Sequence, residues 1–242
     1  MALRGRLLQV AMRVAFEPEA PRWPILCGCV FLVSGAVLAY EVALTRLFSA
    51  FLRYHFVFLV VSVAVLGLGL GALLGRAVKA FLLPSLLFAL SVLSLHVALM
   101  KWGLISLAST PALLAPILSV PFLFAGWFMA SSFRAGVKKA GALYFSDLAG
   151  AATAAVLAIF ALDAFGGIGT PLVVAAVAGM APFALGASFR RVVGMGLSAL
   201  TATVAISLLA QGGLSLPTMK VESPILKPLF SHLGRPGWPE RI

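Results

Sequence analysis

Long uncharged runs of residues dominate this sequence and constrain its fold more than any other feature. Seven such runs cover 23–40, 56–75, 80–100, 102–133, 148–162, 164–189 and 192–219. Most of them match or exceed the roughly 20 residues that an α-helix needs to cross about 30 Å of hydrocarbon. Because the runs are continuous blocks and do not alternate between apolar and polar residues, they predict helices and not barrel strands. The 62% hydrophobic content and the mean hydropathy of +1.11 also favour a membrane domain over a soluble one.

We therefore expect an all-α fold, a polytopic membrane bundle of about seven transmembrane helices. The bundle would occupy 24–210, between an amphipathic lead-in at 1–23 and a polar C-terminal tail at 211–242. The expected spans are 24–48, 54–75, 82–100, 115–133, 142–165, a sixth that follows a tight turn at 166–171 and ends near 187, and 192–210. The proline-marked segment 109–116 is expected as a lead-in to the fourth span. Arginines at positions 4, 6 and 13 favour a lead-in on the membrane surface over a signal peptide.

The basic residues are distributed unequally between the two expected membrane faces. The side of the N-terminus would hold eleven of them, namely Arg4, Arg6, Arg13, Arg22, Arg76, Lys79, Arg134, Lys138, Lys139, Arg190 and Arg191. The opposite side would hold three before the tail is counted, namely Arg46, Arg53 and Lys101. This bias predicts a cytoplasmic N-terminus in the inner (plasma) membrane. Four basic residues in the tail conflict with an odd number of crossings, so either the number of spans is off by one or the tail crosses despite its charge.

The net charge of +11 raises the alternative of nucleic-acid binding. The basic residues lie mostly in short loops and tails, however, and they form no basic stripe with interleaved aromatic residues. We therefore expect the lipid bilayer, and no nucleic acid, as the partner of this charge.

A few polar residues inside the expected spans are candidates for function. Glu41 lies about 25 Å along the first span and is near the far interface. An intramembrane carboxylate is a functional candidate by default, although snorkelling to the interface would also explain Glu41 and Arg46. Asp147 lies early in the fifth span, where a local ion pair or a helix-dipole contact competes with a polar contact to the first or second span. Asp163, at the opposite interface, is expected to be solvated.

Three glycines in the second span, Gly67, Gly71 and Gly75, are four residues apart. They line one helix face, and this spacing predicts a close helix crossing. The same string is not a nucleotide loop, because Leu74 occupies the place of the third glycine of G-x-G-x-x-G and no strand precedes it.

Catalytic and cofactor signals are weak. His55 and His96 lie in the second and third spans, where structural hydrogen bonds are favoured over haem ligation. Cys27 and Cys29 would point to different sides of one helix, so we expect packing residues and neither a disulfide nor a metal site. No nucleophile pattern is evident, and we assign no catalytic residue, no metal and no cofactor to this chain.

Several spaced strings match those of one known family. They are Ser34-Gly35, Ala39-Tyr40-Glu41, Thr45-Arg46, Tyr54-His55-Phe56, Pro121-Phe122-Leu123-Phe124-Ala125-Gly126 and Tyr144-Phe145-Ser146-Asp147-Leu148-Ala149-Gly150-Ala151. In these strings the chain resembles the membrane portion of spermidine synthase-like (polyamine aminopropyltransferase-like) bacterial proteins. The resemblance implies a membrane module without the S-adenosyl-binding catalytic half that follows in that family, and it adds Tyr40 and Tyr144 to the polar candidates.

Two functions follow as expectations. The first is a non-catalytic membrane module that anchors or partners a separate S-adenosyl-binding catalytic unit. The second is a transporter of a polyamine or another small solute, in which Glu41 and Asp147 face one internal cavity as cation contacts. If both acids line a single water-filled pocket, transport is favoured; if they belong to helix contacts in a dry bundle, anchoring is favoured.

Overall fold

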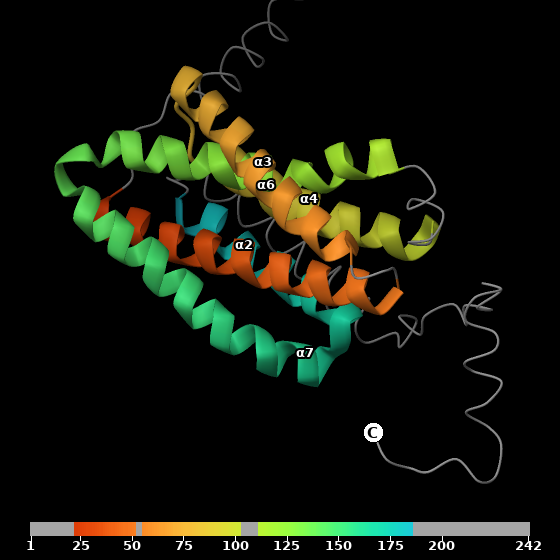
Figure 1. Ribbon diagram of the computed structural model, residues 1–242. Coiled ribbons are helices and arrows are strands. Elements are labelled where there is room, and N and C mark those ends of the chain that lie inside the picture. The colour runs from red at the N-terminus through yellow and green to blue at the C-terminus, as the bar shows by residue number, and fades with distance from the viewer. Residues whose placement is uncertain (1–21, 52–54, 103–110, 186–242) are drawn as a thin grey trace, which may run out of the picture.

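The computed structural model describes residues 22–51, 55–102 and 111–185, and within them the chain is helical with no strand (Figure 1). The elements are α2 (Trp23–Phe51), α3 (His55–Ala77), α4 (Leu82–Trp102), α6 (Pro111–Ala135), the 3-10 turn η1 (Val137–Lys139) and α7 (Ala140–Leu185). The predicted all-α fold is thereby confirmed. Most of the expected lead-in, the seventh span at 192–210 and the tail at 211–242 lie outside the described residues.

Five helices are long and apolar enough to cross a bilayer, by length and composition. They are Trp23–Ser49, Phe58–Ala77, Leu82–Leu99, Ala115–Ala135 and Val137–Gly166. A sixth apolar helix, Gly169–Pro182, is shorter than a full span, since a helix of this length extends about 21 Å against about 30 Å of hydrocarbon. These helices fit a multi-pass membrane protein, and the number of seven spans stays a prediction.

The start of α6 differs from the expectation. Residues 111–116 of the expected lead-in are already helical, because α6 begins at Pro111 and includes Pro116 and Pro121. A proline in the first turn removes an N–H group that has no partner within the helix, so Pro111 is compatible with a helix start. The apolar membrane-length part of this helix is Ala115–Ala135, which agrees with the expected span of 115–133.

Gly166 divides α7 into two arms. Its φ of 68° and ψ of 176° are not helical, and this conformation is essentially restricted to glycine. The tight turn expected at 166–171 is thus a sharp kink at one residue. The Thr170 hydroxyl lies within hydrogen-bond distance of two carbonyl oxygens near the kink, those of Gly166 at 2.7 Å and Ala161 at 3.1 Å. It thereby satisfies backbone groups that the broken helix leaves without their usual partners.

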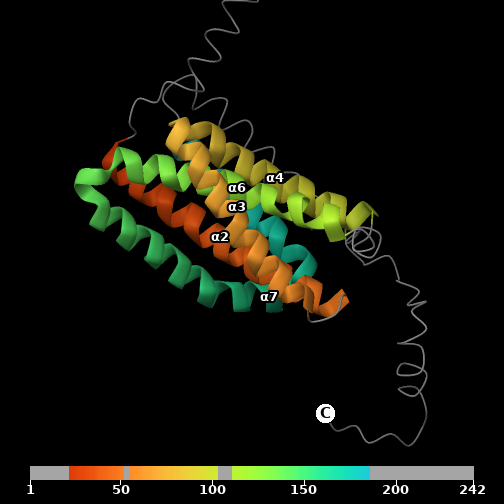
Figure 2. The ribbon, with the colours of Figure 1, turned by 45° about the horizontal axis from the view of Figure 1, so that its top comes forward.

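Two helix pairs make the most extensive contacts, α2 with α7 and α3 with α6, and α4 packs on both α7 and α6. Figures 1 and 2 show α2 running alongside the first arm of α7 (140–165), while the second arm (167–185) returns behind α2. The core between these helices is filled by large buried side chains, including Tyr40, Phe48, Phe88, Phe122 and Phe128. Segments far apart in the sequence are therefore brought together around α2.

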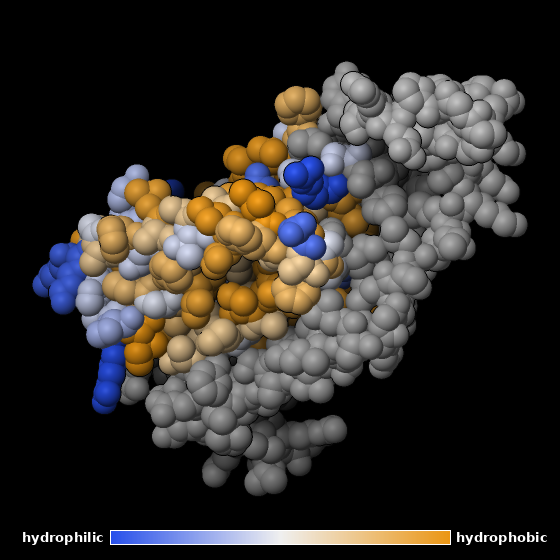
Figure 3. All heavy atoms as spheres, turned by 90° about the horizontal axis from the view of Figure 1, so that it is seen from below, coloured by the Kyte–Doolittle hydropathy of each residue, from blue (hydrophilic) through white to orange (hydrophobic). Residues whose placement is uncertain are grey.

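The outer faces of α3 and of the first arm of α7 are apolar. Large exposed hydrophobic side chains on these faces include Phe58, Val65, Leu66, Leu73, Phe145, Val156, Ile159 and Phe160. Figure 3 shows hydrophobic residues over most of the described part of one face, with a group of hydrophilic residues at the end where α6 passes into α7. An apolar outer surface of this extent is suited to contact with lipid.

Candidate functional site

The polar candidates on α2 have different environments. Tyr40 is fully buried, and its ring lies 5.8 Å, centroid to centroid, from the ring of Phe122. Within the described residues its hydroxyl has no hydrogen-bond partner. Glu41 is half-buried and Arg46 is exposed, and the described part of the chain contains no ion pair between them. Five residues separate the two, and this spacing does not place side chains on the same helix face.

Asp147 contacts α2 through its backbone and not through its carboxylate. The Ser34 hydroxyl donates a hydrogen bond of 2.9 Å to the Asp147 carbonyl oxygen. The helix-dipole alternative is wrong, because α7 begins at Ala140 and has no acidic residue in its first turn. In the described residues Asp147 forms no ion pair with Lys138 or Lys139. A polar contact between the first and fifth expected spans does exist, but the side chain that provides it is Ser34.

The acidic candidates do not form one site. Ser34, which lies beside Asp147, is seven residues from Glu41, a separation of about 10 Å along α2. Tyr144 is 58% exposed and Asp163 is also exposed, so both lie on the outer surface of α7. The structure thus places the polar candidates of α2 and α7 at different levels of the bundle.

The two histidines that were haem candidates lie on helices that make no extensive contact with one another. His55 is the first residue of α3, and His96 is buried on α4. The extensive contacts of α3 are with α6 and α2, not with α4. Across the described ranges, no group of three His, Cys, Asp or Glu side chains could hold a metal ion, and both Cys27 and Cys29 are free thiols.

The three spaced glycines of α3 lie against α6. An added Cβ at Gly67 would lie 2.6 Å from the Ser119 carbonyl oxygen, and one at Gly75 would lie 2.6 Å from the Ala130 Cβ. At Gly71 it would overlap the carbonyl oxygen of Leu123. The backbones of α3 and α6 approach so closely that no side chain fits between them at these positions.

Side chains of α6 complete this contact at the C-terminal end of α3. The Trp127 indole donates a hydrogen bond of 2.7 Å to the Val78 carbonyl oxygen, and Arg134 donates to the carbonyls of Gly75 and Arg76. These bonds satisfy carbonyl groups that the C-terminus of a helix leaves free. The end of α3 is therefore held on α6.

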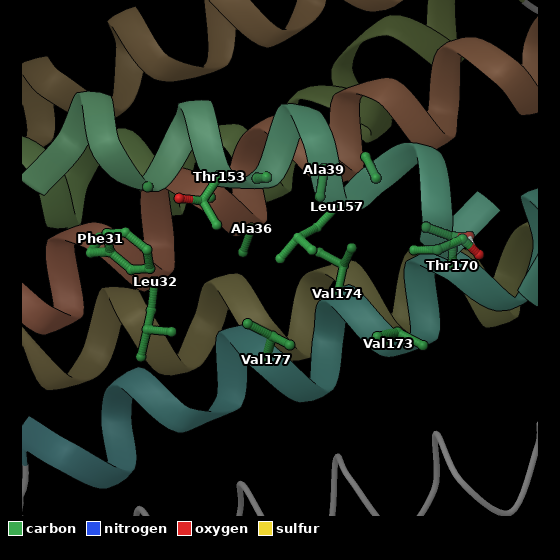
Figure 4. Close-up of a pocket in the computed structure, with 15 residues that line it drawn as sticks. Phe31, Leu32, Ala36, Ala39, Thr153, Leu157, Thr170, Val173, Val174 and Val177 are labelled. Atoms are coloured by element: carbon green, nitrogen blue, oxygen red, sulfur yellow. Dashed lines mark hydrogen bonds between the residues drawn. The ribbon is translucent and has the colours of Figure 1, made fainter. Parts of the chain in front are cut away.

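A cavity of about 240 Å³ lies between α2 and the two arms of α7 (Figure 4). In the figure, Leu157 of the first arm and Val174 of the second arm reach towards one another across it. Its wall on α2 includes Gly35, Ala36 and Ala39. Because these residues are small, they leave space where larger side chains would fill the contact.

The cavity offers little for polar chemistry. Its polar side chains in the described residues are those of Thr153 and Thr170. The Thr153 hydroxyl donates to the Ala149 carbonyl oxygen at 2.7 Å, and Thr170 is engaged at the kink. Neither Glu41 nor Asp147 lines the cavity. It is thus suited to an apolar group and not to a cation or a sugar.

Basic residues gather at the end of the bundle where α2 begins, α3 ends and α6 passes into α7. Six described residues form this basic end, namely Arg22, Arg76, Lys79, Arg134, Lys138 and Lys139. The Lys139 ammonium lies 5.2 Å from the Trp23 ring centroid, and Lys79 lies 5.8 Å from that of Phe81. The opposite end of the described helices has two basic residues, Arg46 and Lys101.

Sequence reasoning missed the cavity, although it placed a tight turn at 166–171, where α7 is kinked. A usable signal was present, because Gly35 and Ala39 on α2 and Gly150 and Ala154 on α7 both repeat small residues four positions apart. An added Cβ at Gly35 would lie 3.0 Å from the Gly150 carbonyl oxygen. The signal shows that two helices approach, but it does not identify the pair.

Comparisons of this chain with protein-family models, with curated proteins and with solved structures find no match.

Proposed function

We propose that this protein is a non-catalytic integral membrane module that anchors or partners a separate S-adenosyl-binding catalytic unit, as its resemblance to the membrane portion of spermidine synthase-like proteins implies. One observation carries this choice over transport. Within the described residues, neither Glu41 nor Asp147 lines the cavity between α2 and α7, and the contact at Asp147 is a helix-packing hydrogen bond from Ser34. A solute pathway for cations would need acidic side chains that face the same aqueous space.

We further propose that the module lies in the inner membrane with its N-terminus in the cytoplasm. The basic end supports this orientation, because an excess of Lys and Arg in short loops favours the cytoplasmic side. On this proposal, the loops after α3 and α6 face the cytoplasm, where a soluble catalytic partner would dock.

Transport of a polyamine or another small solute is the second candidate. It is favoured by one feature, the pair Tyr40 and Glu41 on α2. The Tyr40 hydroxyl is buried without a partner in the described residues, and the half-buried Glu41 carboxylate forms no ion pair there. Polar groups in such positions within an apolar helix are costly unless a solute or water reaches them.

The anchoring proposal is tested by tagging the full chain in its native host, cross-linking intact cells and purifying the membrane fraction. We expect the eluate to bind radiolabelled S-adenosylmethionine, and we expect that binding activity to move to the soluble fraction when the gene for this chain is deleted. An eluate without binding activity, or an unchanged distribution after deletion, would contradict the proposal.

Transport is tested separately in proteoliposomes with radiolabelled putrescine. The anchoring proposal predicts the same uptake as in empty vesicles. Uptake that is abolished by Glu41→Gln and retained in the control Asp163→Asn, at an exposed carboxylate, would replace anchoring with transport.

A further inference from the structure

The cavity between α2 and α7 has the chemistry of a site for a hydrocarbon chain. Its lining in the described residues contains no charged side chain, and its two threonine hydroxyls are bonded to carbonyl oxygens of their own helix. A polar ligand would therefore lose its hydrogen bonds to water without replacement. An apolar chain has no such cost, and the volume of 240 Å³ is well above the roughly 10–15 Å³ that a single water needs.

The cavity lies at a depth where lipid tails are present. On α2 its lining runs from Phe31 to Ala39, which are about 12 and 24 Å from Trp23 at a rise of 1.5 Å per residue. With Trp23 at the membrane interface, this interval contains the middle of a hydrocarbon core about 30 Å thick. The cavity also opens outwards, because Leu157 and Val177 on its rim are 57% and 36% exposed.

Charge complementarity identifies the class of lipid. Lys138 and Lys139 precede the first arm of α7 directly. Gly150, the lining residue of this arm that is nearest to them, is about 15 Å along the arm from Ala140. This separation equals the hydrocarbon thickness of one leaflet, about half of 30 Å. A phosphate at the basic end and an acyl chain whose end reaches the near side of the cavity, at Gly150, are therefore compatible with one lipid molecule.

We propose that the groove between α2 and the two arms of α7 binds one acyl chain of an anionic phospholipid from the surrounding bilayer, with its phosphate at the basic end. The proposal rests on membrane embedding and does not depend on which partner the module anchors. A bound lipid would fill the space that the small residues leave between α2 and α7. Because its phosphate would lie at the basic end and its acyl chain between the arms of α7, it would also connect these arms to the cytoplasmic leaflet.

Native mass spectrometry of the full-length protein in detergent, titrated with phosphatidylglycerol, tests this proposal. We expect one phosphatidylglycerol to bind before any further lipid and more tightly than phosphatidylcholine. The variant Ala154→Leu adds three carbon atoms beside Gly35 inside the cavity and should weaken this first binding at least tenfold. The neighbouring Ala155→Leu, on an exposed position outside the lining, serves as the matched control and should leave it unchanged.

A cross-link in the wild-type protein keeps the test independent of how Ala154→Leu folds. A phosphatidylglycerol with a diazirine near the end of one acyl chain should label the lining segments nearest the basic end, 31–36 and 150–154, and excess unlabelled phosphatidylglycerol should suppress this labelling. Equal loss of binding in both leucine variants, or non-saturable labelling spread over α3, would overturn the proposal. So would protection of the groove by residues 192–210 or by a second copy of the chain, shown by protein cross-links in place of lipid.

Discussion

Replacing Gly71 with alanine adds one methyl group where the backbones of α3 and α6 meet. The new Cβ would overlap the Leu123 carbonyl oxygen and lie 2.7 Å from the Trp127 amide nitrogen. Ordinary contacts begin at about 3.4 Å, so the two helices must separate by at least 0.7 Å at this point. A gap of this size removes a quarter to a half of the dispersion energy of the atom pairs that it separates.

We expect this clash to cost about 1–3 kcal/mol of unfolding free energy, the usual range for an overpacked contact. Gly69 provides the control, since it lies on the same helix, is exposed, and has nothing within 4 Å of an added Cβ. Both substitutions gain up to about 1 kcal/mol of helix propensity. The difference between Gly69→Ala and Gly71→Ala therefore isolates the effect of the helix contact.

The assay is thermal unfolding of both variants in the same detergent, followed by tryptophan fluorescence. For a chain of this length each kcal/mol corresponds to about 2–4 °C, so Gly71→Ala should melt about 2–12 °C below Gly69→Ala. Equal melting temperatures would refute the conclusion that α3 and α6 are in backbone contact along these glycines.

Two other predictions concern the α2–α7 contact and the orientation. Ser34→Ala removes the hydrogen bond to Asp147 and should cost about 0.6 kcal/mol and at most about 1.7 kcal/mol. The control Ser49→Ala, whose hydroxyl bonds within its own helix, should cost less; the reverse order would count against the contact. In a cysteine-free background, a membrane-impermeant maleimide should label Lys138→Cys in inverted vesicles and Asp163→Cys in right-side-out ones, and labelling of both from the same side would reject the proposed topology.

The helices themselves were predictable from sequence, because their length and apolar character are local properties. The third expected span, 82–100, compares with an α4 that extends from Leu82 to Trp102. The start of α6 was less predictable, because prolines at 111 and 116 are typical of both a loop and a first helical turn.

The candidate site was less accessible to sequence reasoning. Periodicity places Gly67, Gly71 and Gly75 on one face of α3, but it does not say that this face meets α6. Likewise, Asp147 was a candidate because it is an acid within an expected span, although the atom that contacts α2 is its backbone carbonyl oxygen, which every residue possesses. The cavity depends on the direction of the second arm after Gly166, and this direction is a property of the folded chain.

The kink at Gly166 forms a corner whose angle determines the width of the cavity between the two arms of α7. The backbone at this residue has a φ of 68°, and an added Cβ would meet no neighbour within 4 Å, so alanine there would be strained through its dihedral angles alone. Such a variant would keep its helical content and change the angle between the arms. A substitution at this one glycine would thus change the space that the helices enclose without changing how much helix the chain contains.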